Sequence, residues 1–233
     1  MNDPSDASQL PAWLTAIGTI GLALVAAFQD QIRAALARPR LVLRFRQTPP
    51  MCRLSSRSFP EVPNLRERFF DFHFQVENEG RSQARRVEAF LEAIWVHDAS
   101  NTPKQIEGFW PVKLRYDNKG TLHLDLNPHG PPVYWNLGFI PSPVIQGAMR
   151  GDAYIEVPGA DDKGLRFYLD VLDRPFFQPN TLPPGNYSIK VSVYSENAAR
   201  VDSYFGIIWT GNWKEDEQKM FEEIRITQVK TVT

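Results

Sequence analysis

Few residues of this chain have the type and spacing that chemistry requires. The nearest to a metal-binding set is His123-x-Asp125-x-x-x-His129, because zinc accepts imidazole nitrogens and a carboxylate as ligands. His123 and Asp125 stand two positions apart, which places both side chains on one face of a strand. A polar strand face that runs into a Pro and Gly turn explains the same pattern. We therefore expect no metal site and no bound cofactor.

Two other features carry weaker chemical signals. Asp161 and Asp162 offer the oxygen ligands that calcium prefers, but they lie in an ordinary turn sequence, Ala-Asp-Asp-Lys-Gly. Cys52 is the single cysteine, so no internal disulfide can form, and we expect an unreactive thiol. The sequence lacks the motifs of serine hydrolases, dinucleotide-binding enzymes, phosphate-binding loops, zinc proteases and thiol oxidoreductases. We expect a protein that is not an enzyme.

The N-terminal segment is the most informative part of the sequence. Residues 1–9 form a short polar tail, and no charged residue occurs from Leu10 to Phe28. As a helix this run is about 28 Å long, close to the ~30 Å of a bilayer's hydrocarbon core. Trp13 stands where an aromatic interface anchor is placed. We predict one transmembrane helix, followed by a basic exit, over residues 10–38.

Two alternatives to a spanning helix stay open. A cleaved signal peptide needs a positively charged start, whereas residues 1–9 carry only acidic charges. A buried helix of a soluble protein would suit the moderate hydrophobicity of a run rich in Ala, Gly and Thr.

Arginines determine the expected orientation of this helix. Five arginines against one acid, Asp30, follow the apolar run: Arg33, Arg38, Arg40, Arg44 and Arg46. By the positive-inside rule the C-terminal side is cytoplasmic. The expected location is the bacterial inner membrane, with a single pass and the N-terminus outside. Trp13, Arg33, Arg38 and Arg40 are then the membrane-interface residues.

One stripe of the helix carries small residues. Thr15, Thr19, Ala23 and Ala27 recur at four-residue spacing, with Gly18 beside them. Such a stripe lets two helices approach closely, so a homo-oligomer through this face is one expectation. Ala, Gly and Thr are also common in spanning helices that do not associate.

The rest of the chain has the pattern of an antiparallel β-sandwich over residues 41–230. Phe70, Phe72, Phe74 and Val76 alternate with polar residues, and the range 187–194 repeats this period of two. Turn sequences rich in Pro, Gly, Asn and Asp separate about nine strands, and proline reaches 19 of 233 residues against a usual ~5%. We expect irregular loops at 47–68 and 97–111. A short helix is expected with Asn212 as its N-cap.

Charge is near neutral overall but unevenly spread. The net charge of −1 argues against a nucleic-acid partner. Residues 30–86 hold twelve arginines and six acids, whereas residues 87–233 hold fourteen basic and nineteen acidic residues. A basic part close to the helix exit suits a domain held against an anionic lipid leaflet.

One motif and the overall layout resemble known bacterial proteins. Asn78, Gly80, Ala84 and Val87 belong to the pattern V-x-N-x-G-x-x-x-A-x-x-V, which resembles a strand–turn–strand motif of bacterial immunoglobulin-like domains, including the cell-adhesion-related type. The apolar helix, the R-P-R exit and a late P-G-x-Y…Y-S-E-N…W-x-G-x-W pattern look like a group of uncharacterised bacterial single-pass membrane proteins. That resemblance implies an all-β, immunoglobulin-like fold behind one transmembrane helix. It implies no catalytic residues.

These observations favour a membrane-anchored binding or scaffold module. It would present a cytosolic sandwich to a protein partner or to further copies of itself, in the manner of an accessory to a bacterial stress or defence system. Trp209 and Trp213 are the candidate partner surface. Two alternatives remain: an enzyme with an unrecognised loop site, and an exported adhesion or carbohydrate-binding domain in reversed topology.

Overall fold

A computed structural model describes residues 12–58, 66–116, 123–144, 164–172, 179–229 and 231–232. The chain divides into two compact units, Met1–Arg38 and Pro39–Thr233; the second unit is called the body. The strands of the body are β1 (Leu41–Arg44), β2 (Cys52–Ser58), β3 (Arg66–Asn78), β4 (Ala84–His97), β5 (Pro103–Gln105), β6 (Val112–Lys113), β7 (Leu124–Leu126), β8 (Val133–Pro141), β9 (Phe167–Leu169), β10 (Thr181–Leu182), β11 (Gly185–Tyr194), β12 (Val201–Trp209) and β13 (Ile224–Val229).

The described part of the first unit is a single helix, α1 (Ala12–Leu36). Its large apolar side chains are 41–73% exposed: Trp13, Leu14, Ile17, Ile20, Leu22, Leu24, Val25 and Phe28. Within the described residues, no helix combines the length and the apolar character that crossing a membrane requires. The expected tail at residues 1–9 lies outside the described part.

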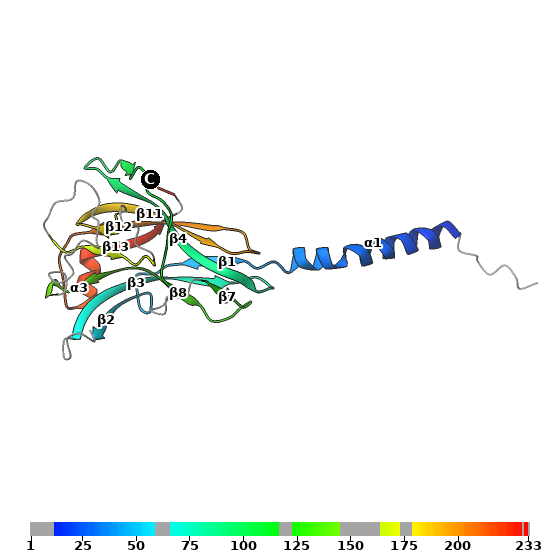
Figure 1. Cartoon of the computed structure of the whole chain (residues 1–233), viewed down its shortest axis with the longest axis horizontal. Helices are drawn as coiled ribbons and strands as arrows, with labels where there is room; N and C mark the ends of the chain where they lie inside the picture. Colours follow the sequence, from blue (N-terminus) through cyan, green and yellow to red (C-terminus); the bar gives the residue numbers. More distant parts are fainter. Residues whose placement is uncertain are drawn as a thin grey trace, which may run out of the picture. The chain divides into compact units, whose positions relative to one another are not determined.

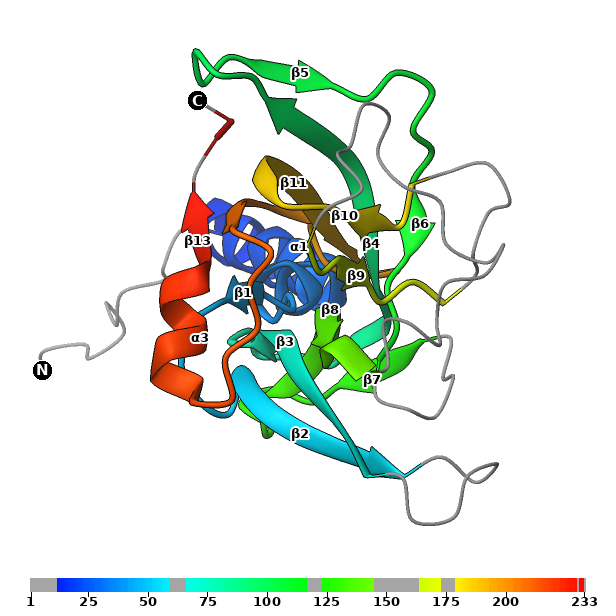
Figure 2. The same ribbon diagram turned by 90° about the vertical axis from the view of Figure 1, so that its left-hand side faces the viewer.

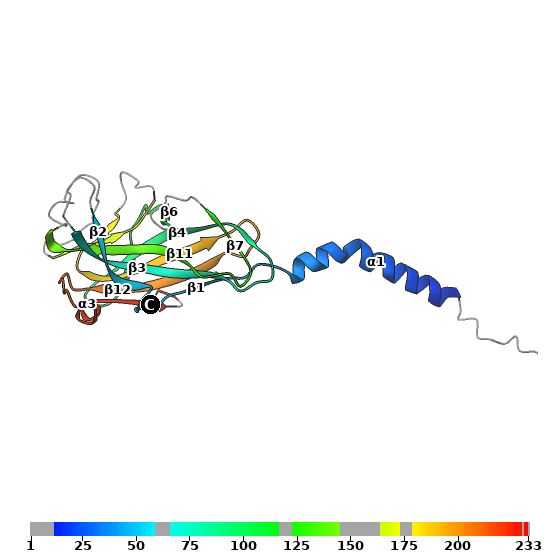
Figure 3. The same ribbon diagram turned by 90° about the horizontal axis from the view of Figure 1, so that it is seen from below.

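The body consists of two antiparallel sheets packed face to face (Figures 1 and 3). The six-stranded sheet has the order β1-β3-β8-β9-β10, with β2 also paired to β3. The seven-stranded sheet has the order β13-β12-β11-β4-β5, and β6 and β7 pair with β4 as well. The all-β sandwich is thus confirmed.

The described residues form thirteen strands rather than the expected nine or so. Two of the additional strands occupy ranges that we expected to be irregular, because β2 lies within 47–68 and β5 within 97–111. Their sequences are short or polar and show no alternation of apolar residues. They are strands because they pair with β3 and β4. Residues 153–157, whose apolar sequence also predicts a strand, lie outside the described residues.

Alternating side chains build the core between the sheets. Phe70, Phe72, Phe74 and Val76 on β3 are fully buried, as the sequence period predicts. From the other sheet, Ile189, Val191 and Val193 of β11 belong to the same buried core cluster. All residues of the buried core cluster lie between Leu41 and Ile226, so the body carries a complete hydrophobic core of its own.

The side chain of Asn78 joins three segments at the corner between β3 and β4. Its Oδ1 accepts hydrogen bonds from the backbone N–H of Gly80, at 3.0 Å, and of Arg40, at 3.1 Å. Its Nδ2 donates to the backbone oxygens of Ser82, at 2.7 Å, and Leu126, at 2.9 Å. The residue is 3% exposed, so these four bonds satisfy an amide that water cannot reach.

The rest of this motif also forms a buried corner. Ala84 and Val87 are fully buried on β4, and Gly80 is buried in the turn. Arg86 between them has a φ of 48°, at the point where the register between β4 and β7 shifts. The four motif residues therefore hold a turn together rather than forming a surface.

A short helix, α3 (Glu217–Glu223), precedes β13, and Figure 2 shows it along the side of the sandwich. Its N-cap is Asp216, whose carboxylate accepts from the Lys219 N–H at 2.9 Å, so the expectation of Asn212 is wrong. The side chain of Asn212 instead donates to Glu223 at 3.0 Å. Capping by Asp216 begins the helix four residues later than we expected.

The Asn78 corner gives a first prediction. Asn78→Asp keeps the size of the side chain but replaces the two N–H donors with an oxygen that faces the carbonyls of Ser82 and Leu126. We expect the free energy of unfolding to fall by about 3 kcal/mol or more. Urea unfolding followed by tryptophan fluorescence measures it. Arg81→Ala, an exposed neighbour, should change it by less than ~0.5 kcal/mol. Equal midpoints for both variants would contradict the role of Asn78.

Cys52 gives a second prediction. It is fully buried on β2, and burial, followed by the charge of Glu217, raises the pKa of its thiol to about 12. At pH 8 the thiol is therefore protonated as well as shielded, and iodoacetamide should label it only after unfolding. The matched control is Ser56→Cys in a Cys52→Ala background, because Ser56 is exposed on the same strand. Equal labelling of both native proteins would mean that β2 does not cover Cys52.

Candidate functional site

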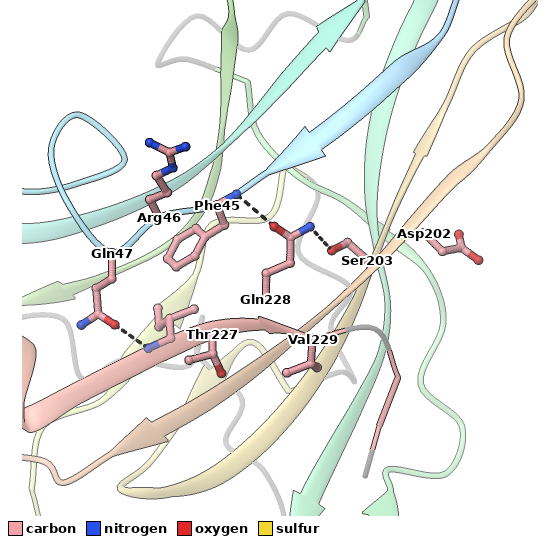
Figure 4. A pocket seen from close by; sticks show the side chains of 9 residues that line it. Phe45, Arg46, Gln47, Asp202, Ser203, Thr227, Gln228 and Val229 are labelled. Atoms are coloured by element: carbon pink, nitrogen blue, oxygen red, sulfur yellow. Dashed lines mark hydrogen bonds between the residues drawn. The ribbon is translucent and has the colours of Figure 1, made fainter.

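A groove of about 690 Å³ lies between β13 and the segment Phe45–Gln47, which follows β1 (Figure 4). Its lining is mainly polar: Phe45, Arg46, Gln47, Asp202, Ser203, Ile226, Thr227, Gln228 and Val229. This size falls within the usual range for ligand and peptide sites. The groove runs along the end strand of the seven-stranded sheet, whose outer edge pairs with no strand among the described residues.

Gln228 forms the floor of the groove. It reaches from β13 across to the other sheet, where its Oε1 accepts from the Phe45 N–H at 3.1 Å. Its Nε2 donates to the Leu43 oxygen at 3.2 Å and to the Ser203 hydroxyl at 2.8 Å (Figure 4). One carboxamide thus connects β1 with β12 and β13.

Gln47 makes the matching connection from the opposite side. Its Oε1 accepts from the Ile226 N–H at 2.8 Å, and its Nε2 donates to the Ile224 oxygen at 2.5 Å. These two backbone groups lie on the outer edge of β13, where another strand would bind. The amide of Gln47 therefore covers the first half of that edge, and the half from Gln228 onward borders the groove.

Helix α3 closes the same side of the sandwich further along. Met220 is fully buried, and Phe221 packs against Phe70 of β3 with ring centroids 6.3 Å apart. The Glu217 carboxylate accepts from the Leu54 N–H of β2 at 3.3 Å. Because α3 continues directly into β13, these contacts fix the strand that forms one wall of the groove.

Asp202 carries the negative charge at the groove. Burial raises the pKa of its carboxyl, but hydrogen bonds from Arg200, Ser192 and Lys190 outweigh burial and leave the pKa below its ordinary value. The Ser192 hydroxyl lies 2.7 Å and the Lys190 ammonium 3.2 Å from this carboxylate. Asp202 is therefore a charged, already paired group at neutral pH.

The expected membrane-interface residues lie in or just after α1. Trp13 is 59% exposed, and Arg38 and Arg40 are exposed in the segment that follows the helix. Arg33 belongs to α1, but its side chain is outside the described part. The backbone of Arg40 is also fixed to the body, since its oxygen accepts from the Glu79 N–H at 2.8 Å.

The expected self-association stripe is exposed along α1: Thr15, Gly18, Thr19, Ala23 and Ala27. Apart from its chain neighbours and the helix's own backbone, no described atom lies within 4 Å of the position that a Cβ on Gly18 would take. The hydroxyl of Thr19 donates to the Thr15 oxygen at 2.8 Å, so it is satisfied within the helix.

The expected partner surface at Trp209 and Trp213 needs correction. Trp209 is 2% exposed, and its indole N–H donates to the Leu165 oxygen at 2.7 Å, so it belongs to the core. Trp213 is partly buried, with its ring 5.3 Å from that of Phe70. Trp209 serves packing, because alternation on β12 points it inward, whereas Trp213 stays partly accessible and its indole N–H donates to the Glu215 carboxylate at 3.1 Å.

His123, Asp125 and His129 have structural surroundings rather than a shared site. The Asp125 carboxylate accepts from the Arg86 N–H at 2.8 Å, and the His129 N–H donates to the Asn78 oxygen at 2.9 Å. Across the described ranges, no three His, Cys, Asp or Glu side chains are grouped as metal ligands. Asp161 and Asp162 lie outside those ranges.

Sequence reasoning missed the two glutamines that shape the groove. Gln47 and Gln228 are 181 positions apart, and nothing in their local sequence marks them. Glutamine at the end of an alternating strand, as at Gln228 after Ile224 and Ile226, is the one signal that points to an inward polar group.

Comparisons with known proteins add no relationship to this geometry. No family model, no curated protein and no solved structure matches the chain.

Proposed function

We propose that this protein is a non-catalytic binding module that α1 holds in a lipid bilayer and that docks an extended segment of a partner protein in the groove beside β13. The observation that carries the anchor is the exposure of α1, whose large apolar side chains are 41–73% accessible. All of them except Leu22 lie on one broad face of the helix, and Ala, Gly and Thr occupy the rest, so no charged side chain interrupts the helix before Asp30. A long helix with such an exposed apolar face and no charge beside it requires apolar surroundings.

Two further features support a lipid environment for α1. The Thr19 hydroxyl bonds to the helix backbone, which removes its need for water. The uncharged run of the sequence begins at Leu10, ahead of the described helix, and reaches Phe28. With arginines after the helix, the proposed location is the bacterial inner membrane, with a single pass, the N-terminus outside and the body in the cytoplasm.

The strand order supports the finer assignment of an immunoglobulin-like body. The neighbours β1-β3-β8 and β12-β11-β4 correspond to the orders A-B-E and G-F-C of immunoglobulin sheets. A difference is that the strand next to β8 is β9, which follows β8 in the chain, whereas strand D precedes strand E. The proposed fold is therefore an immunoglobulin-like variant.

The groove supports a protein partner as the ligand of the body. Gln228 follows Ile226 by two positions, so its backbone N–H and C=O lie on the same outer edge of β13, where strand addition pairs an extended chain. Ser203 and Thr227 line the space beside that edge. Polar lining and an open strand edge favour a peptide backbone over an apolar small molecule.

The anchor gives a third prediction. Ile20 lies near the middle of the uncharged run and is 60% exposed. Ile20→Arg adds about 2.5–3.5 kcal/mol to the cost of insertion. We expect the wild type in the carbonate-washed membrane fraction and much of the variant in the supernatant. Ile208→Arg, on an exposed position of β12, should remain with the membranes.

A topology measurement completes this test. A reporter fluorescent only in the cytoplasm, fused after Thr233, should be active in the membrane fraction. A wild-type protein found in the supernatant would refute the anchor, and activity of an external reporter would refute the orientation.

The groove gives a fourth prediction. Thr227→Arg fills the groove from its wall, and the Thr227 side chain forms none of the groove's hydrogen bonds. We expect a partner cross-linked to the wild type in membranes to be lost with this variant. It should be retained with Gln105→Arg, an exposed site on β5 at the opposite edge of the same sheet. A partner that cross-links equally to both variants would place docking elsewhere.

A further inference from the structure

Two hollows lie beside the turn Thr48–Pro50, and the first shares Arg46 with the groove described above. One, of about 290 Å³, is lined by Arg44, Arg46, Thr48, Pro49, Pro50, Met51 and Gln75. The other, of about 330 Å³, is lined by Pro50, Arg53, His73, Tyr116, Pro132, Val133, Tyr134 and Asn136. They meet at Pro50, and no aspartate or glutamate stands among the described residues that line either of them.

The arginines of these hollows differ in their pairing. Arg44 forms ion pairs with Glu77 and Glu79, so its charge is compensated. Within the described ranges, neither Arg46 nor Arg53 forms an ion pair or a side-chain hydrogen bond, and both are exposed. In Figure 4 the guanidinium of Arg46 points away from β13. Each hollow therefore has one guanidinium that forms no ion pair with a described residue.

A fixed polar network forms the wall of the second hollow. The Asn136 amide donates to the Asp170 carboxylate at 2.7 Å, which turns its Oδ1 toward His73 Nδ1, 2.8 Å away. Because that oxygen only accepts, His73 carries a proton on Nδ1. Arg115 pairs with Asp170 at 3.3 Å and compensates this carboxylate. A second carboxylate, the buried Asp71, lies opposite Arg53 in the register of β2 with β3 and accepts from the Ser55 hydroxyl.

We propose that these two hollows form one binding site for a phosphate group, with Arg46 and Arg53 as its cationic ligands. A guanidinium offers paired N–H donors that match the oxygens of phosphate. A concave surface of one charge sign, with low-polarity walls such as Pro50 and Val133, concentrates anions. The hydroxyls of Tyr116, Tyr134 and Thr48 can supply further donors to a tetrahedral anion.

A phosphate fits these hollows better than a carboxylate does. Two guanidinium groups on opposite sides of Pro50 call for an anion with several acceptor oxygens and more than one negative charge. Phosphate monoesters have both properties, and a single carboxylate has neither. The group can belong to a soluble phosphate compound or to a phosphate-bearing lipid headgroup, and the two sources share this chemistry.

The test uses the body, residues 39–233, which carries its own core. It is titrated with inorganic phosphate at constant ionic strength, with sodium chloride as the reference salt, and binding is followed by nuclear magnetic resonance shifts. We expect saturable shifts at Arg46 and Arg53. Arg46→Gln with Arg53→Gln should weaken phosphate binding at least tenfold, whereas Arg81→Gln, an exposed arginine outside both hollows, should leave it unchanged.

Vesicles distinguish the two sources of phosphate. Phosphatidic acid carries a phosphate monoester and phosphatidylglycerol a diester, and both charge the vesicle surface. Preference for phosphatidic acid, removed by the double variant, would identify a lipid headgroup, whereas binding of phosphate without vesicle preference would identify a soluble compound. No saturable binding, or an equal effect of Arg81→Gln, overturns the proposal. The body lacks α1, so this result is independent of the anchor. Arg46 also lines the groove whereas Arg53 does not, so Arg53→Gln alone separates phosphate binding from docking in the groove.

Discussion

The carboxamide of Asn78 holds the place where three parts of the body meet. Its two acceptor bonds fix the entry of the chain at Arg40 and the turn at Gly80, and its two donor bonds fix Ser82 and Leu126. A buried amide is stable only when nearly all of these bonds form together. The same side chain therefore fixes the register of β3 with β1 and the direction in which β4 leaves the corner. The two sheets face each other because this corner sends consecutive strands into different layers.

The open side of the sandwich depends on two more carboxamides. A sandwich has strand edges at its sides, and an unpaired edge invites association with other chains. Gln47 occupies the edge of β13 with a side chain instead of a strand, and Gln228 joins β13 to the end of β1. Together with α3 they close that side without completing the sheet. The part of the edge that they do not cover borders the polar groove. Gln47 and Gln228 therefore both close the sandwich and line the cavity.

Sequence patterns predicted the parts of this fold that depend on local alternation. The period at Phe70–Val76 and at Tyr187–Val193 predicted buried strands, and the motif around Asn78 predicted a corner. The strand β2 was missed because its residues Arg53, Ser55 and Ser56 have no apolar period, and pairing with β3 alone makes it a strand. Trp209 was assigned to a surface because a tryptophan's type does not show which face of a strand it occupies. The groove was beyond prediction, since it requires Gln47 and Gln228 from opposite ends of the chain.

The arginines show why an excess of basic residues in the sequence does not by itself locate an anion-binding site. The basic excess of residues 30–86 is a property of the sequence, but ion pairs divide it unequally. Arg44, Arg68 and Arg86 meet carboxylates of Glu77, Glu215 and Glu196, so their charges largely cancel at short range. Arg46 and Arg53 lie beside hollows whose described lining contains no acid. An unpaired cation on open surface is screened by salt within about 10 Å. In a hollow, fewer water molecules and mobile ions can approach, so the same charge acts on a bound anion with less screening. The local absence of carboxylates, rather than the number of arginines, therefore determines where an anion would bind.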